Sequence, residues 1–338
     1  MLTKKLKYKL TIMITNKTVL VTGGAGFIGS NLCESLLNNN NIVRCLDNLS
    51  TGKKENIIPF LKNKNFIFIE GDIRDLDTCH KAVEGVEIVL HQAALGSVPR
   101  SINDPITTND VNISGFLNML VAARDAKINR FIFAASSSTY GDSKTLPKVE
   151  DIIGKPLSPY AVTKYVNELY ADVFYKTYGL ETIGLRYFNV YGRRQDPNGA
   201  YAAVIPKFTQ LLMNLESPTI NGDGTNSRDF TYIDNVVQMN HLAATTDNKD
   251  AIGSIFNTAV GDRVNLTQMT SLLKDYLAEF NSEIGEVQII HGPERLGDIP
   301  HSHASIEKAK NLLGYNPTHD LAKGLKEAVN WYWENLNK

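Results

Sequence analysis

The sequence predicts an α/β fold with a doubly wound parallel sheet, followed by a smaller mixed α/β lobe. Short apolar or β-branched runs alternate with helical patterns through the first half of the chain, and a glycine-rich loop directly follows the first run. From about Tyr191 onward, turn-rich stretches break this alternation. We therefore expect helices on both faces of the sheet and a ligand site at the carboxyl ends of its strands.

The individual elements follow from the same patterns. The predicted strands are residues 18–22, 42–47, 66–70, 87–91 and 130–135, and a helix is expected over residues 30–37. Further helices are expected over residues 235–244 and 266–280, with turns at 221–224 and 292–293. We expect residues 17–190 to form the main domain, with some later segments returning to it, and residues 191–338 to form mainly the smaller lobe. Without a flexible linker, the two parts should share an interface and a cleft.

Composition excludes several classes of partner. The 338 residues are 43% hydrophobic, which is ample for a buried core, and their formal net charge is −1. That charge gives no overall field to attract nucleic acid or an anionic membrane, so we predict neither as a partner. Cys33, Cys45 and Cys79 lack the spacing of a metal site or a disulfide framework, and we expect buried thiols in a reducing compartment.

Residues 1–16 are a basic N-terminal extension in the sequence. Their lysines precede an apolar stretch, residues 11–14, that is too short for the roughly 7–15 residues of a signal-peptide core. No other run approaches the roughly 20 residues that span a bilayer. We therefore expect a cytoplasmic protein whose first 16 residues are either a basic arm or an upstream extension of a chain that begins at Met13.

A glycine-rich loop joins the first predicted strand to the first helix. Gly23, Gly26 and Gly29 recur at every third position in Gly-Gly-Ala-Gly-Phe-Ile-Gly. We expect Gly23 to permit a sharp turn, Gly26 to let the backbone approach a pyrophosphate, and Gly29 to let the helix pack close to the strand. Strand, loop and helix in this order predict the Rossmann dinucleotide-binding fold.

Acidic residues end the second and third predicted strands. Asp47 lies where the ribose hydroxyls of a dinucleotide are usually bound, and its carboxylate favours NAD because it repels the 2′-phosphate of NADP. Lys53 and Lys54 leave NADP as a minor alternative. Asp72 either accepts a hydrogen bond from the adenine amino group or serves as a turn or cap residue.

Hydroxyl-bearing residues follow the fifth strand and precede a Tyr-x-x-x-Lys run. Tyr160 and Lys164 lie one helical turn apart on the same face of a predicted helix. A free tyrosine has a pKa of about 10, and a fixed cation nearby lowers that pKa. We interpret Tyr160 as a base tuned by Lys164, with the serines of residues 136–138 holding a substrate hydroxyl while a hydride leaves its carbon. Each pattern alone is also common in amphipathic helices and capped strand ends.

Taken in order, these motifs resemble the extended short-chain dehydrogenase/reductase family over residues 17–335. Four further segments resemble nucleotide-sugar epimerases, specifically bacterial UDP-N-acetylglucosamine 4-epimerases: HQAALGSVPR at 91–100, RYFN at 186–189, GRRQDP at 192–197 and RLGD at 295–298. The resemblance implies NAD-dependent epimerisation at C4 of UDP-N-acetylhexosamines through a 4-keto sugar, without a metal. His301 and His303 alternate along the chain but lack a third ligand, so we predict no metal site there.

The resemblance also implies the residues of the site. Tyr160 would be the base, Lys164 would lower its pKa and hold the nicotinamide ribose, and Ser136 would bind the sugar hydroxyl with Ser137 or Ser138 assisting. The cofactor, NAD, is expected against Gly23, Gly26, Phe27, Ile28, Gly29, Asp47, Asn48, Ser50, Thr51, Gly52, Asp72, Ile73, Gln92, Ala93, Ala94, Asn112, Tyr160, Lys164 and Tyr187. The UDP-sugar is expected against Ser97, Arg100, Ser136, Ser138, Tyr160, Asn189, Ala203, Val204, Lys207, Asn221, Arg228, Arg295, Asp298 and Ser302.

Within that set, Asn189, Arg228 and Arg295 match positions that hold the diphosphate, and Lys207 matches the uridine end. Ser302 stands where epimerases restricted to glucose and galactose carry a bulky tyrosine, so a small serine leaves room for an N-acetyl group. The resemblance further implies a homodimer through the helices near residues 113–126 and 160–178.

Three other functions are compatible with a Rossmann dinucleotide-binding fold. A 4,6-dehydratase of the same family would carry an acidic pair where Ser137 and Ser138 stand, and without it the elimination lacks its proton donor. A reductase is disfavoured by the residues that match sugar-diphosphate positions. A dinucleotide-sensing module would not need Ser136, Tyr160 and Lys164. The sequence does not rank N-acetylated, uronic and plain UDP-sugars as substrates.

Overall fold

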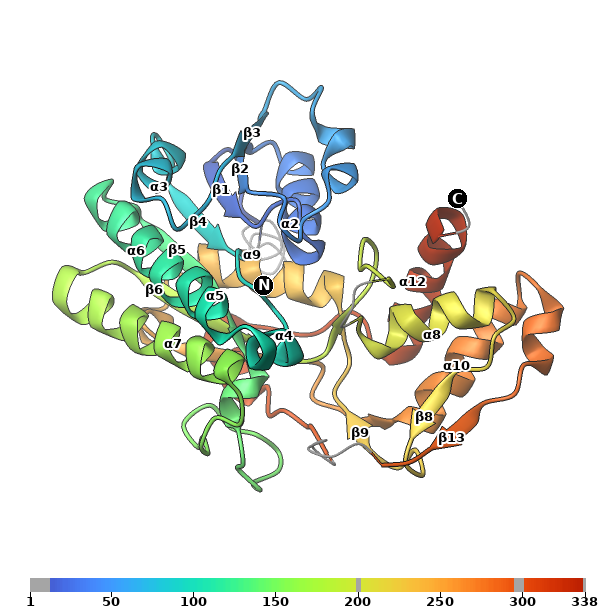
Figure 1. The fold of residues 1–338 in the computed structure, drawn as a ribbon. Helices are drawn as coiled ribbons and strands as arrows, with labels where there is room; N and C mark the ends of the chain where they lie inside the picture. Colours follow the sequence, from blue (N-terminus) through green and yellow to red (C-terminus); the bar gives the residue numbers. More distant parts are fainter. Residues whose placement is uncertain (1–12, 199–201, 295–300, 337–338) are drawn as a thin grey trace, which may run out of the picture.

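A seven-stranded parallel sheet forms the centre of the computed structural model, which describes residues 13–198, 202–294 and 301–336 (Figure 1). Its strand order is β11-β6-β5-β4-β1-β2-β3, and every neighbouring pair is parallel. The strands are β1 (Thr18–Thr22), β2 (Ile42–Asp47), β3 (Phe66–Glu70), β4 (Ile88–His91), β5 (Arg130–Ser136), β6 (Thr182–Tyr187) and β11 (Ile255–Thr258). The predicted fold class is therefore confirmed.

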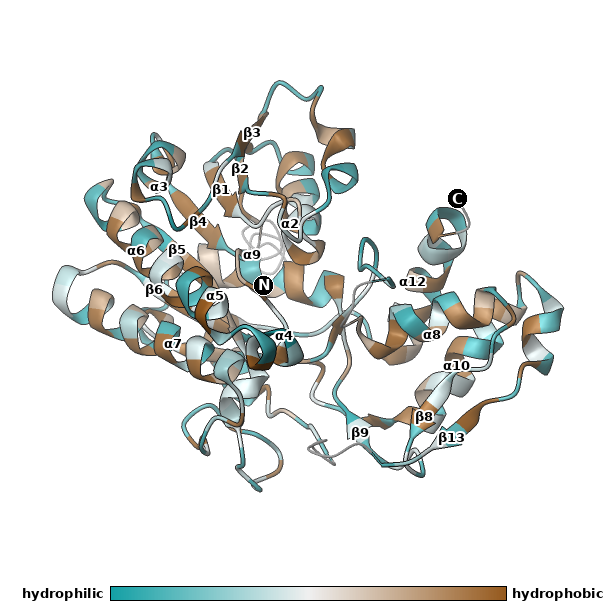
Figure 2. Ribbon diagram, viewed as in Figure 1, coloured by the Kyte–Doolittle hydropathy of each residue, from teal (hydrophilic) through white to brown (hydrophobic). Residues whose placement is uncertain are grey.

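Helices cover both faces of this sheet because successive strand residues point to opposite sides. In β1, Val19 and Val21 enter one hydrophobic core while Leu20 enters the other. The first core contains α2 (Phe27–Asn38) and α9 (Ile233–Thr245); the second contains α3 (Leu76–Val83), α6 (Gly115–Asp125) and α7 (Pro159–Tyr178). Figure 2 shows hydrophobic residues along the strands of the sheet and a mixture of hydrophobic and hydrophilic residues along the helices around it. The three cysteines are free and buried, as predicted.

A smaller lobe of helices and short strand pairs stands beside the carboxyl edge of the sheet, at the right in Figure 1. Its helix α10 (Leu266–Ala278) packs against α8 (Val204–Met213) and α12 (Leu321–Leu336). The strand pairs are β8 (Thr219–Asn221) with β13 (Ile290–Gly292), β9 (Ser227–Arg228) with β12 (Val264–Asn265), and β7 (Val190–Tyr191) with β10 (Thr231–Tyr232). Phe208, Leu273 and Tyr332 belong to the same core cluster as Val21, so lobe and sheet are packed together without a flexible linker.

The chain returns to the sheet after entering the lobe. β11 pairs with β6 at the edge of the sheet, and α9 packs on the sheet face next to α2. The remaining elements are the helices α4 (Val98–Asn103), α5 (Pro105–Asn109) and α11 (Glu307–Leu313), a π-helical turn at Asp110–Ser114, and 3-10 turns at Lys54–Asn56, Ile58–Phe60, Ser137–Tyr140, Lys249–Ala251 and Ser282–Glu286.

Several element boundaries differ from the predicted ones by up to three residues. The first helix begins at Phe27 rather than residue 30, because Gly26 serves as its N-cap. The fifth strand extends to Ser136, the fourth begins at Ile88, α9 gains residues at both ends, and α10 ends at Ala278. Within the described residues, no helix combines the length and apolar character needed to cross a bilayer.

Candidate functional site

A cavity of about 510 Å³ runs along the carboxyl edge of the central sheet. It lies at the carboxyl ends of β1 and β4. From β1 the strand order continues in one direction through β2 and β3, and in the other direction through β4, β5 and β6, so the order reverses at this point. The segments that follow β1, β2, β3, β4, β5 and β6 all contribute to its wall. Every predicted cofactor residue lines this cavity except Asn112.

The glycine loop forms one end of the cavity and leaves no room for side chains. Gly23 has a φ of +66°, and an added Cβ would lie 2.8 Å from the backbone nitrogen of Ala93. A Cβ at Gly29 would overlap the Gly23 carbonyl oxygen. Gly26 caps α2 without any side-chain hydrogen bond, so backbone N–H groups of the first turn are available to an anion. The cradle and its free donors fit the pyrophosphate of a dinucleotide.

Asp47 stands at the end of β2 with both carboxylate oxygens oriented by backbone. One oxygen accepts the Ala25 N–H at 2.9 Å, and the other accepts the Leu49 N–H at 2.8 Å. Burial raises the pKa of Asp47, while these two hydrogen bonds oppose the shift. A Cβ on Gly52 would lie 2.8 Å from both oxygens, so the segment after β2 folds directly over the carboxylate. The arrangement fits the ribose hydroxyls of NAD.

Asp72 also lines the cavity, but protein groups already occupy its carboxylate. Arg74 pairs with it at 2.7 Å, and the Asn48 side-chain amide donates to it at 2.9 Å. The hydrogen bonds from Arg74 are the main reason that the pKa of Asp72 is lowered to about 2. This geometry corresponds to the turn role that was weighed for Asp72, and contact with an adenine remains a prediction.

Tyr160 and Lys164 lie in the first turns of α7, which begins beneath the cavity. The Ser158 side chain caps the helix by accepting the Ala161 N–H at 3.1 Å, and Pro159 occupies its first turn. Lys164 is buried, and its Nζ donates to the Ala134 carbonyl at 2.8 Å. Both side chains line the cavity, so the phenol and the ammonium face the same space.

The Tyr160 pKa is shifted upward by its surroundings in the protein. Burial raises the pKa, and the hydrogen bond with Ser136 lowers it by a smaller amount. Burial also lowers the pKa of Lys164 to about 8, although the nearby Glu168 opposes that shift. Desolvation of the phenol thus outweighs the effect of the Ser136 hydroxyl, and the lowering of the Tyr160 pKa by Lys164 stays a prediction.

The three serines after β5 have different positions. Ser136 and Ser137 line the cavity, whereas Ser138 does not. Instead, the backbone N–H and the hydroxyl of Ser138 both lie within hydrogen-bonding distance of the Ser136 hydroxyl oxygen, at 3.1 and 2.9 Å. Ser138 therefore orients Ser136 toward Tyr160.

A second cavity, of about 340 Å³, is lined by the segment that follows β6 and by elements of the smaller lobe. It shares Asn189 and Val190 with the first cavity, so the two spaces adjoin. Asn189 has a φ of +35°, which is rare for a residue with a side chain, and its amide donates to the Asp229 carbonyl at 3.0 Å. The predicted substrate residues that line this second cavity are Asn189, Ala203, Val204, Lys207, Asn221 and Arg228.

Several predicted residues lie outside both cavities. Ser97 caps α4, which also contains Arg100, and Ser302 donates its backbone N–H to the Ser227 carbonyl at 3.0 Å. Asn112 is buried behind the cavity wall, where it bonds the backbone N–H of Leu95 at 2.8 Å and the Thr163 hydroxyl at 3.1 Å. Arg295 and Asp298 lie outside the described residues. Their roles stay predictions.

Sequence reasoning missed part of the cavity wall. Gln195, in the loop after β7, lines the first cavity. It belongs to the GRRQDP segment at 192–197, for which the sequence predicts no specific role. The other missed residues are mostly small or apolar, with no chemical signature that distinguishes them: Leu46, Gly71, Leu95, Gly96, Val111, Ala134, Ala135 and Val190.

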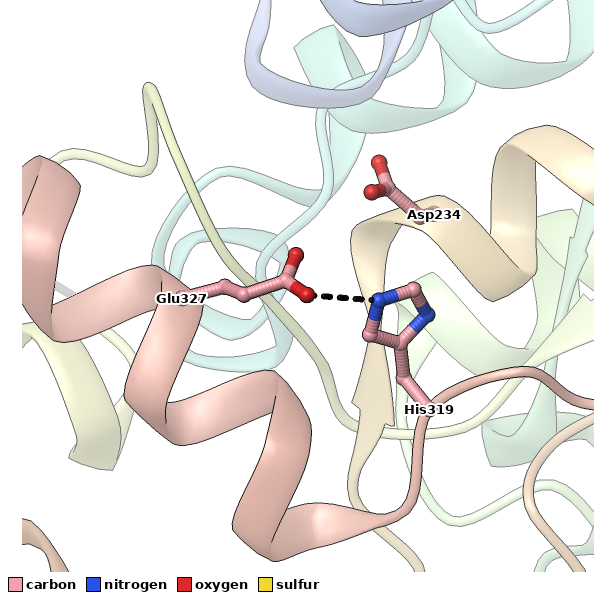
Figure 3. Close-up of side chains that lie close together, drawn as sticks. All are labelled: Asp234, His319 and Glu327. Atoms are coloured by element: carbon pink, nitrogen blue, oxygen red, sulfur yellow. Dashed lines mark hydrogen bonds and ion pairs between the residues drawn. The ribbon is translucent and has the colours of Figure 1, made fainter.

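Among the described residues, one group of three potential metal ligands lies outside the two cavities of the site. Donor atoms of Asp234, His319 and Glu327 lie within 4.8 Å of one another (Figure 3). The His319 ring faces Glu327 at 3.1 Å, and Arg193 pairs with Asp234 at 2.8 Å. Because a guanidinium disfavours a second cation at the same carboxylate, we interpret the group as polar contacts of α9 and the α12 segment rather than a metal site.

Comparisons with known proteins agree with this geometry. The model of the NAD dependent epimerase/dehydratase family matches residues 19–259. A putative UDP-glucose 4-epimerase of Methanocaldococcus jannaschii is 39% identical over 320 residues, which cover 94% of this chain and 99% of the relative.

Two solved structures carry ligands in similar folds. The UDP-N-acetylglucosamine 4-epimerase of Methanobrevibacter ruminantium M1, in complex with UDP-N-acetylmuramic acid, is 38% identical with a TM-score of 0.88, covering 95% of this chain and 99% of that one. The UDP-glucuronic acid 4-epimerase of Bacillus cereus, with UDP-glucuronic acid and NAD, is 32% identical with a TM-score of 0.84, covering 94% and 99%. Together with the glycine cradle, Asp47 and the Tyr160–Lys164 pair, these matches show that the chain belongs to the NAD-dependent epimerase/dehydratase family.

Proposed function

We propose that this protein is an NAD-dependent 4-epimerase of UDP-sugars and that its preferred substrates are UDP-N-acetylglucosamine and UDP-N-acetylgalactosamine. One observation carries the proposal: the wall that holds Tyr160, Lys164 and Ser136 adjoins a second cavity, at Asn189, that is lined by Lys207 and Arg228. A sugar that meets the phenol would thus have its nucleotide end beside cationic side chains. The similarity to 4-epimerases of UDP-sugars supports the same function.

The residues of the first cavity fit NAD. Gly23, Gly26 and Gly29 give the pyrophosphate a cradle at the start of α2, and Asp47 provides acceptors for the adenosine ribose. Lys164, which lines the same cavity, would hold the nicotinamide ribose with its ammonium. When bound, NAD accepts a hydride from C4 of the sugar and returns it to the opposite face.

Tyr160 and Ser136 handle the proton of the 4-hydroxyl. The sugar hydroxyl would lie against both side chains, with Ser138 fixing the Ser136 hydroxyl in place. Tyr160 takes the hydroxyl proton as the 4-keto sugar forms and gives it back after the sugar has turned over. Burial raises the pKa of the Tyr160 phenol, so its ionisation would depend on positive charge in the site, which Lys164 and the nicotinamide ring of NAD would supply.

The preference for N-acetylated sugars rests on Ser302. This small residue lies beside β9. His301 forms an isolated β-bridge with Ser227, and the backbone N–H of Ser302 donates to the Ser227 carbonyl. Arg228, the neighbour of Ser227, lines the second cavity. A small side chain at this position leaves room for an acetyl group beside the sugar, whereas a tyrosine would fill it. Plain and uronic UDP-sugars are the alternatives that an assay must compare.

A 4,6-dehydratase is the second function that the family includes. Its elimination step needs a general acid near C5 and C6 of the sugar, yet serines occupy positions 137 and 138. Among the described residues that line the two cavities, the carboxylates are Asp47 and Asp72, both at the adenosine end. The epimerase is therefore favoured.

We further propose that the protein forms a homodimer through the outer face of α7. Val162, Leu169 and Val173 form a stripe on α7, with exposed fractions of 45%, 50% and 50%. A contiguous apolar stripe on an outer helix is typical of a protein interface. Leu169→Glu should convert a dimer into monomers in light scattering, whereas an exclusively monomeric parent protein would contradict the proposal.

The experiment that tests the function incubates purified protein with each UDP-sugar and no added NAD, and separates the products by chromatography. We expect a 4-epimer from UDP-N-acetylglucosamine, and loss of the reaction in Tyr160→Phe by at least about 10³-fold. Tyr178→Phe is the matched control, because Tyr178 is an exposed tyrosine at the far end of the same helix. If no UDP-sugar yields a 4-epimer, or if Tyr160→Phe behaves like Tyr178→Phe, the proposal fails.

A further inference from the structure

Three functional groups recur at intervals of four residues along α7. Tyr160, Lys164 and Glu168 therefore share one face of the helix, with Lys164 between the phenol and the carboxylate. Lys164 and Glu168 are deeply buried, with exposed fractions of 3% and 6%. A buried ammonium loses its hydration and tends to discharge unless an anion stands nearby.

Glu168 is held in place by Arg186 of β6. The guanidinium Nε and Nη2 donate to the two Glu168 oxygens, each at 2.8 Å. The third contact of Arg186 is the Glu150 carbonyl, at 2.8 Å, and its guanidinium lies 4.7 Å from the centre of the Tyr140 ring. Such a two-pronged pair fixes the position of the carboxylate, one helical turn beyond Lys164, within range of its electrostatic influence.

The other groups around Lys164 do not supply a negative charge. His91 of β4 is neutral, because burial lowers its pKa to about 3, and the Tyr160 phenol is protonated because burial raises its pKa. The Ala134 carbonyl of β5 accepts a hydrogen bond but carries no net charge. A separate cavity, with no lining residue in common with the first cavity, borders the Glu168–Arg186 pair. The other charged groups that line this separate cavity are Glu150, Asp151, Asp172 and Lys308.

We propose that Glu168 is a positioning residue for the reaction, because its carboxylate, fixed by Arg186, keeps the Lys164 ammonium charged in a site that would otherwise discharge it. This inference deepens the proposed function and rests on it. A charged Lys164 is needed to bind the ribose and to support the Tyr160 phenolate. Its pKa of about 8 lies close to physiological pH, so loss of the carboxylate would remove the charge within the working range.

The test compares two Arg–Glu pairs of the same domain. Glu168→Gln removes the charge beside Lys164 and preserves the shape, while Glu181→Gln breaks the Arg130–Glu181 pair, also at 2.8 Å, at the opposite end of β6. In Glu168→Gln, we expect the alkaline limb of the kcat–pH profile to shift to lower pH by at least about one unit. In Glu168→Asp, this limb should return to its position in the parent protein. The profile of Glu181→Gln should match that of the parent.

A second readout does not depend on turnover. NMR titration of protein labelled with ¹³C at lysine Cε, with the Lys164→Arg variant as the assignment, measures the Lys164 pKa directly. We expect a value near 8 in the parent and a value at least about one unit lower in Glu168→Gln. If that single variant fails to fold because Arg186 is left unpaired, Glu168→Gln/Arg186→Met removes both charges and should still lower the pKa.

The outcomes separate the two proposals. A Lys164 pKa that is the same in parent and variants, within about 0.3 units, overturns the role of Glu168 even if the parent is an active epimerase. A shifted Lys164 pKa in a parent that epimerises no UDP-sugar upholds the electrostatic role of Glu168 and overturns the proposed reaction.

Discussion

Gly29→Ala is a sharp test of the cofactor cradle, because two physical effects predict opposite results. Gly29 lies within α2, where alanine is ordinarily preferred by about 1 kcal/mol. At this position, however, the added Cβ would lie 2.8 Å from the Gly23 carbonyl carbon and from the Gly24 Cα, and it would overlap the Gly23 carbonyl oxygen. Ordinary carbon contacts are about 3.5–4.0 Å, so the loop backbone must retreat by about 1 Å.

The expected consequence is a loss of both stability and cofactor affinity. Overpacking against backbone costs about 1–3 kcal/mol, which exceeds the gain in helix propensity. A displacement of about 1 Å in a binding group lowers its effectiveness by about 100-fold, and we expect NAD affinity to fall by that order. Titration calorimetry of NAD into nucleotide-free protein and urea unfolding measure the two effects.

Gly285→Ala is the matched control. Its added Cβ would meet Ala278 Cβ at 3.8 Å, an ordinary contact in the smaller lobe, so NAD affinity should not change. If Gly29→Ala binds NAD within about threefold of the parent and unfolds at higher urea, the loop does not hold the cofactor as we describe, and helix propensity has prevailed.

The remaining predictions concern three buried polar residues. Asp47→Ala leaves the Ala25 and Leu49 N–H groups without their acceptor, and calorimetry should show NAD affinity lower by about 10–100-fold; unchanged affinity would contradict the ribose assignment. His241 accepts the Ile14 N–H at 3.1 Å, and burial lowers its pKa to about 4. Because this pKa lies below that of the unfolded chain, stability is lost as pH falls from about 6.5 to 4, by up to about 3 kcal/mol. His241→Gln should flatten this part of the urea-unfolding profile, and equal slopes would refute the cause. Asn112→Leu should cost about 2–4 kcal/mol of unfolding free energy, since it removes the bonds to Leu95 and Thr163; a loss below about 1 kcal/mol would show that the cavity wall does not need them.

Local chemistry was sufficient to predict the strands and the cofactor end of the site. The first three strands have the predicted bounds because β-branched and apolar residues fill them and turn residues end them. Gly23, Gly29 and Asp47 were identifiable because a dinucleotide requires those residue types at the ends of successive strands. The carboxyl ends of parallel strands then bring them into one cavity regardless of their separation in sequence.

The residues that escaped prediction depend on contacts between distant segments. No local signal shows that β11 returns to pair with β6, because its four residues resemble any short apolar run. The role of Asn112 arises from Leu95 and Thr163, which only the fold brings near it. The burial that raises the Tyr160 pKa is likewise a tertiary property, whereas the neighbouring lysine is visible in the sequence.

We propose that C4 of a UDP-sugar is transiently oxidised in this site, with Tyr160 as the base, and that the same hydride returns to the opposite face of the sugar. UDP-N-acetylglucosamine deuterated at C4, incubated with the protein without added NAD and followed by NMR and mass spectrometry, tests this directly. If the same hydride returns to C4, the parent protein should form UDP-N-acetylgalactosamine that retains deuterium at C4. The Tyr160→Phe variant should form none. An epimer that has exchanged its C4 deuterium for solvent hydrogen, or a 4-keto-6-deoxy sugar in place of an epimer, would contradict this proposal.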